Sequence, residues 1–390
     1  MSIYLDNAST SFPKPSCVAE AVYSYMTQAG SNINRGTGPM AHSVADQVFT
    51  TRQLLCELFH GEDCKNVVFT KNITEALNQV IKGLLKPGDH VLVSAMEHNA
   101  IMRPLQQLAA QGISFTRMAC DQEGQLLCAD LEQYLQPQTK AVIMTHASNV
   151  CGTLLPITAA ANFCRRHNLY FILDTAQTAG LFPIDMQDLN LAALCFTGHK
   201  TLLGPQGIGG FILREDLIQQ LEPLIAGGTG SISHRESIPS FMPDRFEAGT
   251  PNLPGIIGLK AALKWLKDQD CDRLREQELK LTAYMLEELK PLEEQQLLQI
   301  IGTKDLTKRT SIISITTSKM DIAELAYILS EEYGIAARVG LHCAPQAHKT
   351  LGTYPKGTLR FSLGWSNSLE DITAAVKALE TVLGHKSVKK

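Results

Sequence analysis

The stretch that indicates the fold class most directly is YFILDTAQ, residues 170–177. Its first four residues form a short apolar run with aromatic and β-branched side chains, which favours a buried strand over a helix. Asp174 follows this run directly, and in open α/β sheets the ligand crevice lies at the carboxyl ends of the strands. Asp174 is therefore predicted either to cap a helix or to hold the protonated ring nitrogen of a bound ligand.

Short apolar runs of the same kind, separated by helix-length segments, continue on both sides of this stretch. Further strands are predicted at residues 67–69, 90–93, 141–144 and 208–213, with helix-length segments at 74–85 and 157–166. Strands that alternate with helices in this way predict a mostly parallel sheet with helices on both faces.

The texture changes after residue 252, which indicates a second, smaller α+β domain. A long helical region is predicted at 256–289, and it is followed by strands near 312–315, 335–339 and 358–363 and by helices at 322–333 and at the end of the chain. A chain of 390 residues exceeds the size at which one core usually stops growing, so two domains are expected. We predict an α/β fold whose large domain spans 15–252 and whose small domain combines 1–14 with 253–390.

Composition and charge exclude several classes of protein. The formal net charge of −4 gives no general basic field for nucleic acid or an anionic membrane. No apolar run approaches the ~18 residues that cross a bilayer, and the N-terminus lacks a signal-peptide pattern, so a cytoplasmic protein is expected. None of the ten cysteines forms a C-x-x-C pair, so zinc ribbons and thioredoxin-type motifs are not expected, and no metal site is predicted.

One lysine lies in a short polar loop directly after a threonine, a glycine and a histidine. FTGHK, residues 196–200, ends a predicted strand with a small polar loop, and GPQG at 204–207 keeps that loop tight. A lone loop lysine is usually a solvated charge. Beside a hydroxyl and an imidazole, however, Lys200 suits a Schiff-base lysine next to a phosphate.

Two further segments follow predicted strands. Thr74, with Glu75 beside it, reads as a helix cap, and the same helix start would present free N–H groups to a phosphate. His98 in EHNA, residues 97–100, is either structural or placed to stack on a planar cofactor and relay protons.

Taken together, the motifs resemble the class V aminotransferase branch of fold-type I pyridoxal 5′-phosphate (PLP) enzymes. Within that branch the chain is similar to the group II, SufS-like, cysteine desulfurases and selenocysteine lyases. The matching motifs are LDNAST at 5–10, NRG at 34–36, TE at 74–75, EHN at 97–99, SNVxG at 148–152, DxxQ at 174–177, TGHK at 197–200, RFEAGTPN at 245–252 and HCA at 342–344.

The resemblance implies a complete PLP site. Lys200 would carry the cofactor, His98 would stack on its ring, Asp174 would pair with the pyridine nitrogen and Gln177 with the phenolic oxygen. The phosphate would be held by Thr74, Thr197, His199 and, from the neighbouring subunit of a homodimer, Thr250.

The resemblance also implies the reaction. Asn149 would lie near both the cofactor and the substrate carboxylate, and Arg35 would be a further substrate-binding arginine of the site. Arg360 would clamp the substrate carboxylate, a task that suits a bidentate and always charged guanidinium. Cys343 would attack the sulfur of L-cysteine as a thiolate, giving L-alanine and a persulfide that passes to a sulfur-acceptor protein. Cationic groups near Cys343 in the sequence, His342 and Arg338, would favour the thiolate.

Three alternatives stay open at this point. They are a selenocysteine lyase, a true class V aminotransferase, and a PLP-binding or sulfur-scaffold protein without activity. Residues 227–233 differ from the Gly-Gly-x-Met-Ile run typical of group II, and Leu341 replaces a second histidine often found before His-Cys. The choice between cysteine and selenocysteine, the acceptor and any activating partner are therefore not decided by the sequence.

Overall fold

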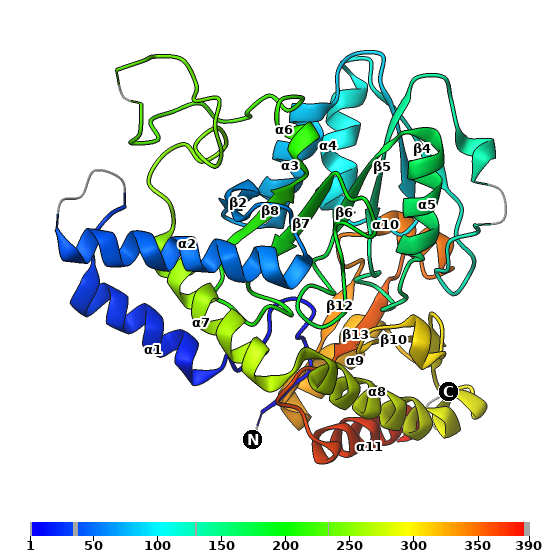
Figure 1. Ribbon diagram of the computed structural model, residues 1–390. Coiled ribbons are helices and arrows are strands. Elements are labelled where there is room, and N and C mark those ends of the chain that lie inside the picture. The colour runs from blue at the N-terminus through cyan, green and yellow to red at the C-terminus, as the bar shows by residue number, and fades with distance from the viewer. Residues whose placement is uncertain (1, 34–37, 129–130, 233, 386–390) are drawn as a thin grey trace.

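A seven-stranded sheet forms the centre of the larger part of the computed structural model, which describes residues 2–33, 38–128, 131–232 and 234–385 (Figure 1). Its strand order is β2-β8-β7-β6-β5-β3-β4. The strands are β2 (Val67–Thr70), β3 (His90–Ser94), β4 (Ser114–Met118), β5 (Thr139–Thr145), β6 (Tyr170–Asp174), β7 (Ala193–Thr197) and β8 (Gly209–Leu213). β8 runs opposite to the other six strands, and all pairings that do not involve β8 are parallel, so the prediction of a mostly parallel sheet is confirmed.

Both faces of this sheet are buried. Successive residues of β3 divide between two core clusters, with Leu92 in one and Val91 and Val93 in the other. One face is covered by α3 (Ile73–Leu84), α4 (Asn99–Ala109) and the short α6 (Glu215–Ile218), and the other by α2 (Pro39–Phe59), α5 (Ile157–His167) and α7 (Leu253–Gln269). The helix α1 (Ser16–Ser24) packs along α7 and continues into the π-helical turn η1 (Tyr25–Ala29), while η2 (Cys64–Asn66) and η3 (Glu132–Tyr134) are single 3₁₀ turns.

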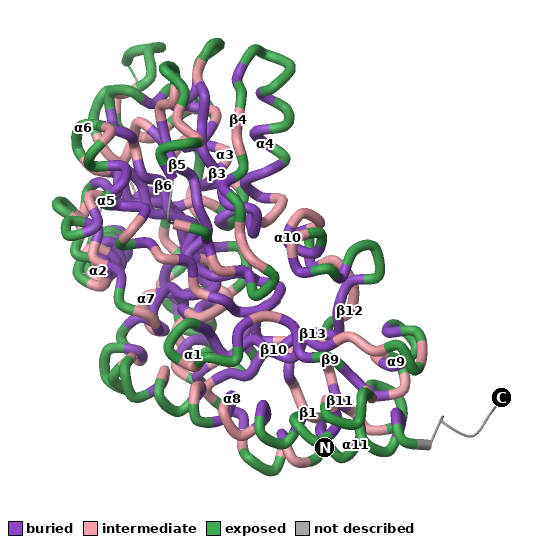
Figure 2. The backbone as a smooth tube through the Cα atoms, turned by 90° about the vertical axis from the view of Figure 1, so that its right-hand side faces the viewer, coloured by how far each residue is buried: buried purple, intermediate pink, exposed green. Residues whose placement is uncertain are grey.

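A smaller antiparallel sheet follows in the order β12-β13-β10-β9, and Figure 2 shows it in a separate lobe with α8, α9 and α11. Its strands are β9 (Gln299–Ile301), β10 (Ile312–Thr316), β12 (Arg338–Gly340) and β13 (Thr358–Ser362), and the other elements are α8 (Cys271–Glu294), η4 (Leu306–Lys308), α9 (Ile322–Tyr333), α10 (Pro345–Thr350) and α11 (Leu369–His385). The N-terminal strand β1 (Ile3–Tyr4) pairs with β11 (Ile335–Ala336), so both ends of the chain contribute to this lobe.

Two predicted elements are divided in the structure. The helical region expected at 256–289 is two helices, α7 and α8, because Asp270 takes a left-handed φ of 63° and its carboxylate accepts a hydrogen bond from Asp272 N at 3.0 Å. The strand expected at 335–339 is the pair β11 and β12, which join different sheets.

The domain division at residue 252 stays a prediction. Buried residues of α7, including Ile256 and Leu259, belong to the core cluster of the larger sheet, whereas Leu281 and Met285 of α8 belong to the core of the small lobe. Among the described residues, none of the helices is apolar over a length that would cross a bilayer.

Candidate active site

Lys200 lies in the loop that follows β7, and this loop is closed by its own backbone. Gly198 N donates to Ile208 O at 2.9 Å, and Gly204 N donates to Gly198 O at 2.7 Å. A Cβ on Gly198 would come within 2.8 Å of Ile208, so the turn requires glycine there. Burial lowers the pKa of Lys200 to about 8, while Asp174 opposes this shift. A neutral amine is therefore accessible close to neutral pH.

Asp174 and Gln177 lie beside this lysine at the end of β6. Asp174 is 3% exposed, and one of its carboxylate oxygens accepts a hydrogen bond from Ala176 N at 2.8 Å. Burial raises the pKa of Asp174, and the charge of Lys200 lowers it in turn. The segment after Asp174 is a turn, so the carboxylate caps a turn rather than a helix. Gln177 is buried and donates to Ala8 O at 3.2 Å, which connects the N-terminal segment to the site.

His98 caps the N-terminus of α4. Its Nδ1 accepts a hydrogen bond from Ala100 N at 3.0 Å, which places the ring proton on Nε2. Burial, with Lys200 and nearby arginines, lowers the pKa of His98 to about 4. The imidazole is therefore neutral at pH 7. Next to it, the buried Glu97 accepts hydrogen bonds from Ser94 and from Thr145 N, and burial raises the pKa of Glu97 to about 8.

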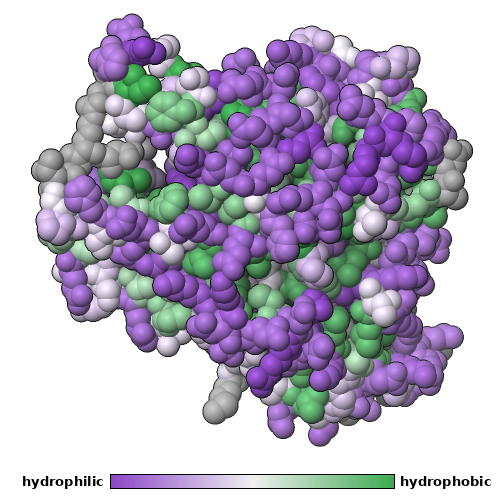
Figure 3. Space-filling view, in the orientation of Figure 1, coloured by the Kyte–Doolittle hydropathy of each residue, from purple (hydrophilic) through white to green (hydrophobic). Residues whose placement is uncertain are grey.

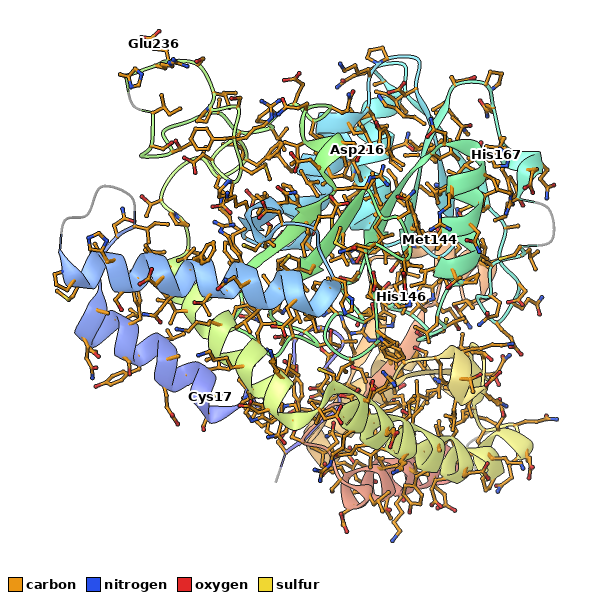
Figure 4. All side chains as sticks on the ribbon, in the orientation of Figure 1. Cys17, Met144, His146, His167, Asp216 and Glu236 are labelled. Atoms are coloured by element: carbon orange, nitrogen blue, oxygen red, sulfur yellow. The ribbon has the colours of Figure 1, made fainter. Side chains whose placement is uncertain are left out.

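His146 was not identified from the sequence. It follows β5 and lies near the centre of the molecule in Figure 4. Its backbone N–H donates to Asp174 O at 2.9 Å, its Nδ1 lies 3.0 Å from Thr178 Oγ1, and burial lowers its pKa to about 4. The backbone of His146 thus supports the backbone of Asp174, while its buried neutral imidazole contacts Thr178.

The residues predicted to bind phosphate divide into two groups. Thr197 Oγ1 and His199 Nδ1 are buried and, within the described part of the chain, have no hydrogen-bond partner. Burial lowers the pKa of His199 to about 4, so its ring is neutral. Because buried polar atoms are nearly always satisfied, two such orphans in one loop fit an absent oxyanion such as a phosphate.

Thr74 and Thr250 are both exposed. The cap of α3 is Asn72, whose side chain accepts from Glu75 N at 3.0 Å, so the interpretation of Thr74 with Glu75 as the cap was wrong. The start of α3 does lie close to the end of β7, because a Cβ on Gly209 would come within 2.8 Å of both Asn72 and Phe196 O. The described contacts do not bring Thr250 to Lys200 of the same chain.

The loop that carries Cys343 lies between β12 and α10. His342 and Cys343 both take left-handed backbone conformations, with φ of 46° and 58°. The side chain of Asn149 donates to His342 O at 2.7 Å, and Asn99 N donates to Cys343 O at 2.8 Å. These two bonds attach the loop to the larger sheet next to His98, and the Cys343 side chain stays exposed.

The expectation that His342 is a cation beside Cys343 was wrong. Its ring is buried, and its Nε2 lies 3.1 Å from Thr358 Oγ1. Burial, with the charges of Arg360 and His348, lowers the pKa of His342 to about 2. Arg338 is the charged residue of this segment.

Arg360 lies on β13 and is 3% exposed at its side chain. One guanidinium nitrogen, Nη1, donates to Asn149 O at 2.9 Å. The other, Nη2, donates to Asp6 Oδ1 and to Ser9 Oγ, each at 2.8 Å. Asn149 therefore contacts both this guanidinium and the Cys343 loop.

The sequence analysis placed Asp6 only within the LDNAST motif and Arg338 only as a cation near Cys343, and it did not predict that both lie next to Arg360. Arg338 of β12 lies directly opposite Arg360 of β13 and donates to Ser9 Oγ at 2.7 Å. Arg338, Arg360 and Asp6 all influence the charge state of Lys200. The signal for them is strand register, which a single sequence does not give. Arg35 lies outside the described residues.

A cavity adjoins Lys200 on the side of α8. Its lining includes Gln177, Lys200, Thr201, Glu278 and Ser311. Glu278 is buried, Ser311 Oγ donates to it at 2.7 Å, and burial raises the pKa of Glu278 to about 7.

Known proteins resemble this chain over nearly its whole length. The family described as Aminotransferase class-V matches residues 3–375. A probable cysteine desulfurase of Halalkalibacterium halodurans is 32% identical over 97% of this chain and 92% of its own length. The cysteine desulfurase CsdA of Escherichia coli is 30% identical over 98% of this chain and 94% of its own.

Solved structures give the same result. The apo structure of a cysteine desulfurase from Thermococcus onnurineus NA1 superposes with a TM-score of 0.91 at 30% identity, covering 98% of this chain and 95% of that one. A crystal structure of E. coli CsdA gives a TM-score of 0.86 at 28% identity, covering 98% and 95%. The predicted α/β architecture of fold-type I is confirmed.

Proposed function

Because this chain belongs to the aminotransferase class-V family, we propose that it is a PLP-dependent cysteine desulfurase. It converts L-cysteine to L-alanine and leaves the sulfur as a persulfide on Cys343. The observation that carries this proposal is the hydrogen bond from Asn99 N to Cys343 O, because it docks an exposed cysteine beside His98 and the Lys200 site. The similarity to proteins named cysteine desulfurases supports the same activity.

The residues present fit the cofactor. Lys200 would hold PLP covalently, Asp174 and Gln177 would contact its ring nitrogen and phenolic oxygen, and His98 would lie against its ring. The orphaned Thr197 Oγ1 and His199 Nδ1, with Thr74, would receive the phosphate. When bound, PLP supplies an electron sink that makes the Cα proton of an amino acid removable.

The remaining steps belong to the chain's own side chains. The amino group of the substrate displaces Lys200 from its covalent bond, and the freed amine of Lys200, with its pKa near 8, takes the proton from the substrate Cα and serves as the proton donor when the product is formed. His98 keeps a proton on Nε2 and stays neutral, so it adds no charge above the ring. The Cys343 thiolate then attacks the substrate sulfur. A sulfur–sulfur bond forms, the Cβ–sulfur bond breaks, and Cβ gains a proton to become the methyl group of alanine.

The carboxylate of the substrate would be held by Arg360 and Asn149. We further propose that the enzyme acts as a cytoplasmic homodimer in which Thr250 reaches the phosphate of the neighbouring site, and that an acceptor protein removes the persulfide. The exposed position of Thr250 is compatible with that arrangement.

Replacing Cys343 by serine tests the proposal. The wild-type protein should absorb near ~420 nm, a typical position for lysine-bound PLP, and should form alanine from L-cysteine. Cys343→Ser should keep the absorption and lose at least about 100-fold of the alanine formation. The matched control Cys64→Ser should keep both. L-Selenocysteine serves as the second substrate.

The outcomes separate the candidate functions. Full turnover of L-cysteine by Cys343→Ser would contradict the persulfide mechanism. Alanine formed from selenocysteine alone, without need of Cys343, would make the protein a selenocysteine lyase. A colourless wild-type protein would contradict PLP binding at Lys200.

A further inference from the structure

The guanidinium of Arg360 is already engaged by a carboxylate of the chain itself. Asp6 Oδ1 accepts from Arg360 Nη2 at 2.8 Å, and Ser9 Oγ accepts from the same nitrogen at 2.8 Å. Nη1 donates to Asn149 O, while Nε is buried and has no hydrogen-bond partner among the described residues. The two N–H groups of Nη2 are thus both in use.

This occupancy has a geometric consequence. A guanidinium has five N–H donors in a fixed plane, and a carboxylate binds it bidentately either through Nη1 with Nη2 or through Nε with Nη2. Both arrangements need an Nη2 donor. A substrate carboxylate can therefore bind Arg360 bidentately only after Asp6 or Ser9 releases Nη2.

We propose that Asp6 is a specificity-determining residue that acts through Arg360: its carboxylate pairs with the guanidinium in the free enzyme and is exchanged for the α-carboxylate of the substrate. This inference deepens the proposed function and rests on it for the identity of the substrate. Exchange of one carboxylate for another keeps the buried guanidinium paired at every stage, and an unpaired buried charge would be strongly destabilising.

The surroundings of Asp6 suit an exchange. Its side chain is 20% exposed, compared with 3% for Arg360, so Asp6 is the member of the pair that can turn outward. Its backbone is fixed independently, because Asp6 bridges to Ser362 and Tyr4 Oη donates to Asp6 O at 3.2 Å. The side chain can therefore move without unpairing the N-terminal segment.

A second cation, Arg338, is available to pair with the Asp6 carboxylate after it leaves Arg360. Arg338 is exposed, lies opposite Arg360 on the neighbouring strand, and donates to Ser9 Oγ at 2.7 Å. Ser9 Oγ in turn donates to Asp6 Oδ1 at 2.7 Å. In the free enzyme Arg360 pairs with Asp6 directly, whereas Arg338 reaches Asp6 only through Ser9 Oγ, so the α-carboxylate of the substrate would bring a second carboxylate to these two guanidinium groups.

The exchange selects ligands by their carboxylate. An α-amino acid brings the group that replaces Asp6, whereas an amine thiol such as cysteamine does not and leaves Asp6 in place. Asp6 thus makes the carboxylate a condition of productive binding and not just one more contact.

The sign of an affinity change tests the inference. In the PLP-loaded enzyme, Asp6→Asn should lower two constants by about tenfold: the KM for L-cysteine and the dissociation constant of L-alanine. The reason is that a neutral amide holds Arg360 less strongly than a carboxylate does. The binding of L-alanine is measured through the change in cofactor absorption. Ser9→Ala should lower both by a smaller factor, since it frees one Nη2 donor. Asp268→Asn, an exposed acid on α7, is the matched control.

The opposite sign would overturn the inference. If Asp6 only orients Arg360, both constants rise in Asp6→Asn and Ser9→Ala, and unchanged constants would equally exclude an exchange. Thermal unfolding tests the exchange without a measurement of catalytic activity. Acetate should raise the Tm of Asp6→Asn more than the Tm of the wild type, and an equal rise in both would count against the exchange. A wild-type enzyme that binds L-alanine but makes none from L-cysteine would disprove the desulfurase function alone.

Discussion

The backbone N–H of Asn99 donates a hydrogen bond of 2.8 Å to the backbone carbonyl of Cys343. This bond joins the small lobe to the start of α4, one residue after His98. Cys343 and its neighbour His342 both have positive φ, which costs a non-glycine residue about 1 kcal/mol or more and persists only where the surroundings hold it. The position of the thiol is therefore set by backbone contacts with the larger part of the chain.

The side chain of Asn149 makes a second hydrogen bond to this loop, to His342 O. Asn149→Ala removes the hydrogen bond to His342 O, so the loop at 341–344 should exchange its amide hydrogens faster, and iodoacetamide should alkylate Cys343 at an altered rate. Asn162→Ala, at an exposed site on α5, is the control. Unchanged hydrogen exchange at 341–344 would show that the loop does not depend on Asn149.

The pKa of Lys200 predicts how cofactor uptake depends on pH. A lysine attacks an aldehyde as the neutral amine, so the rate of PLP uptake by cofactor-free protein should rise with pH up to about 8 and level off above it. Asp174 raises the pKa of Lys200, so Asp174→Asn should move the midpoint to lower pH. Stopped-flow absorbance near ~420 nm measures the rate. A midpoint near the ordinary lysine value would contradict the buried setting of this amine.

Glu278 should destabilise the fold at high pH. Burial raises its pKa from 4.5 to about 7, so the folded protein holds a proton that the unfolded chain has lost, and stability falls as pH rises from about 4.5 to 7. Glu278→Gln removes this cost and should stabilise the protein at pH 8 by up to about 3 kcal/mol, with little gain near pH 4.5. Urea unfolding at both pH values measures the difference. The exposed Glu276→Gln should have no such effect, and an equal effect would point to surface charge.

The homodimer proposal concerns an apolar face on α1, η1 and α2. Tyr23, Met26, Met40 and Phe49 are exposed there, and Figure 3 shows apolar side chains on the side of the molecule that carries these helices. Phe49→Glu should shift the protein from dimer to monomer in sedimentation velocity and weaken PLP binding, because Thr250 would no longer reach the neighbouring site. Tyr327→Glu, at an exposed site on α9, should do neither. A wild-type monomer with full PLP affinity would exclude the role of Thr250.

The sequence predicted what depends on local pattern. Short apolar runs located β2, β3, β5, β6 and β8, because strands buried on both faces leave a continuous apolar signal. The rule that ligands bind at the carboxyl ends of strands indicated Asp174 and Lys200. The edge strand β4 was not predicted, since its residues Ser114–Met118 include polar and partly exposed side chains.

What depends on distant contacts could not be predicted in this way. The pairing of Arg360 with Asp6 and the position of Arg338 follow from the register of β12 with β13 and from the bridge between Asp6 and Ser362. The left-handed conformations at 342 and 343, and the loss of charge on His342 through burial, likewise arise only when the two parts of the chain meet.

The pairing of β1 with β11 and the bridge from Asp6 to Ser362 have a consequence for the order of biosynthesis. The ribosome synthesises the segments that surround Lys200 before it synthesises β11 and Ser362, which pair with the N-terminal residues. The N-terminal strand β1 is therefore synthesised first but can pair only after β11 has been made. During translation the strands and loops that carry Asp174 and Lys200 are thus complete while Arg360 and Cys343 are still absent. The growing chain therefore contains the residues proposed to hold the cofactor before it contains those proposed to bind the substrate carboxylate and to receive the sulfur.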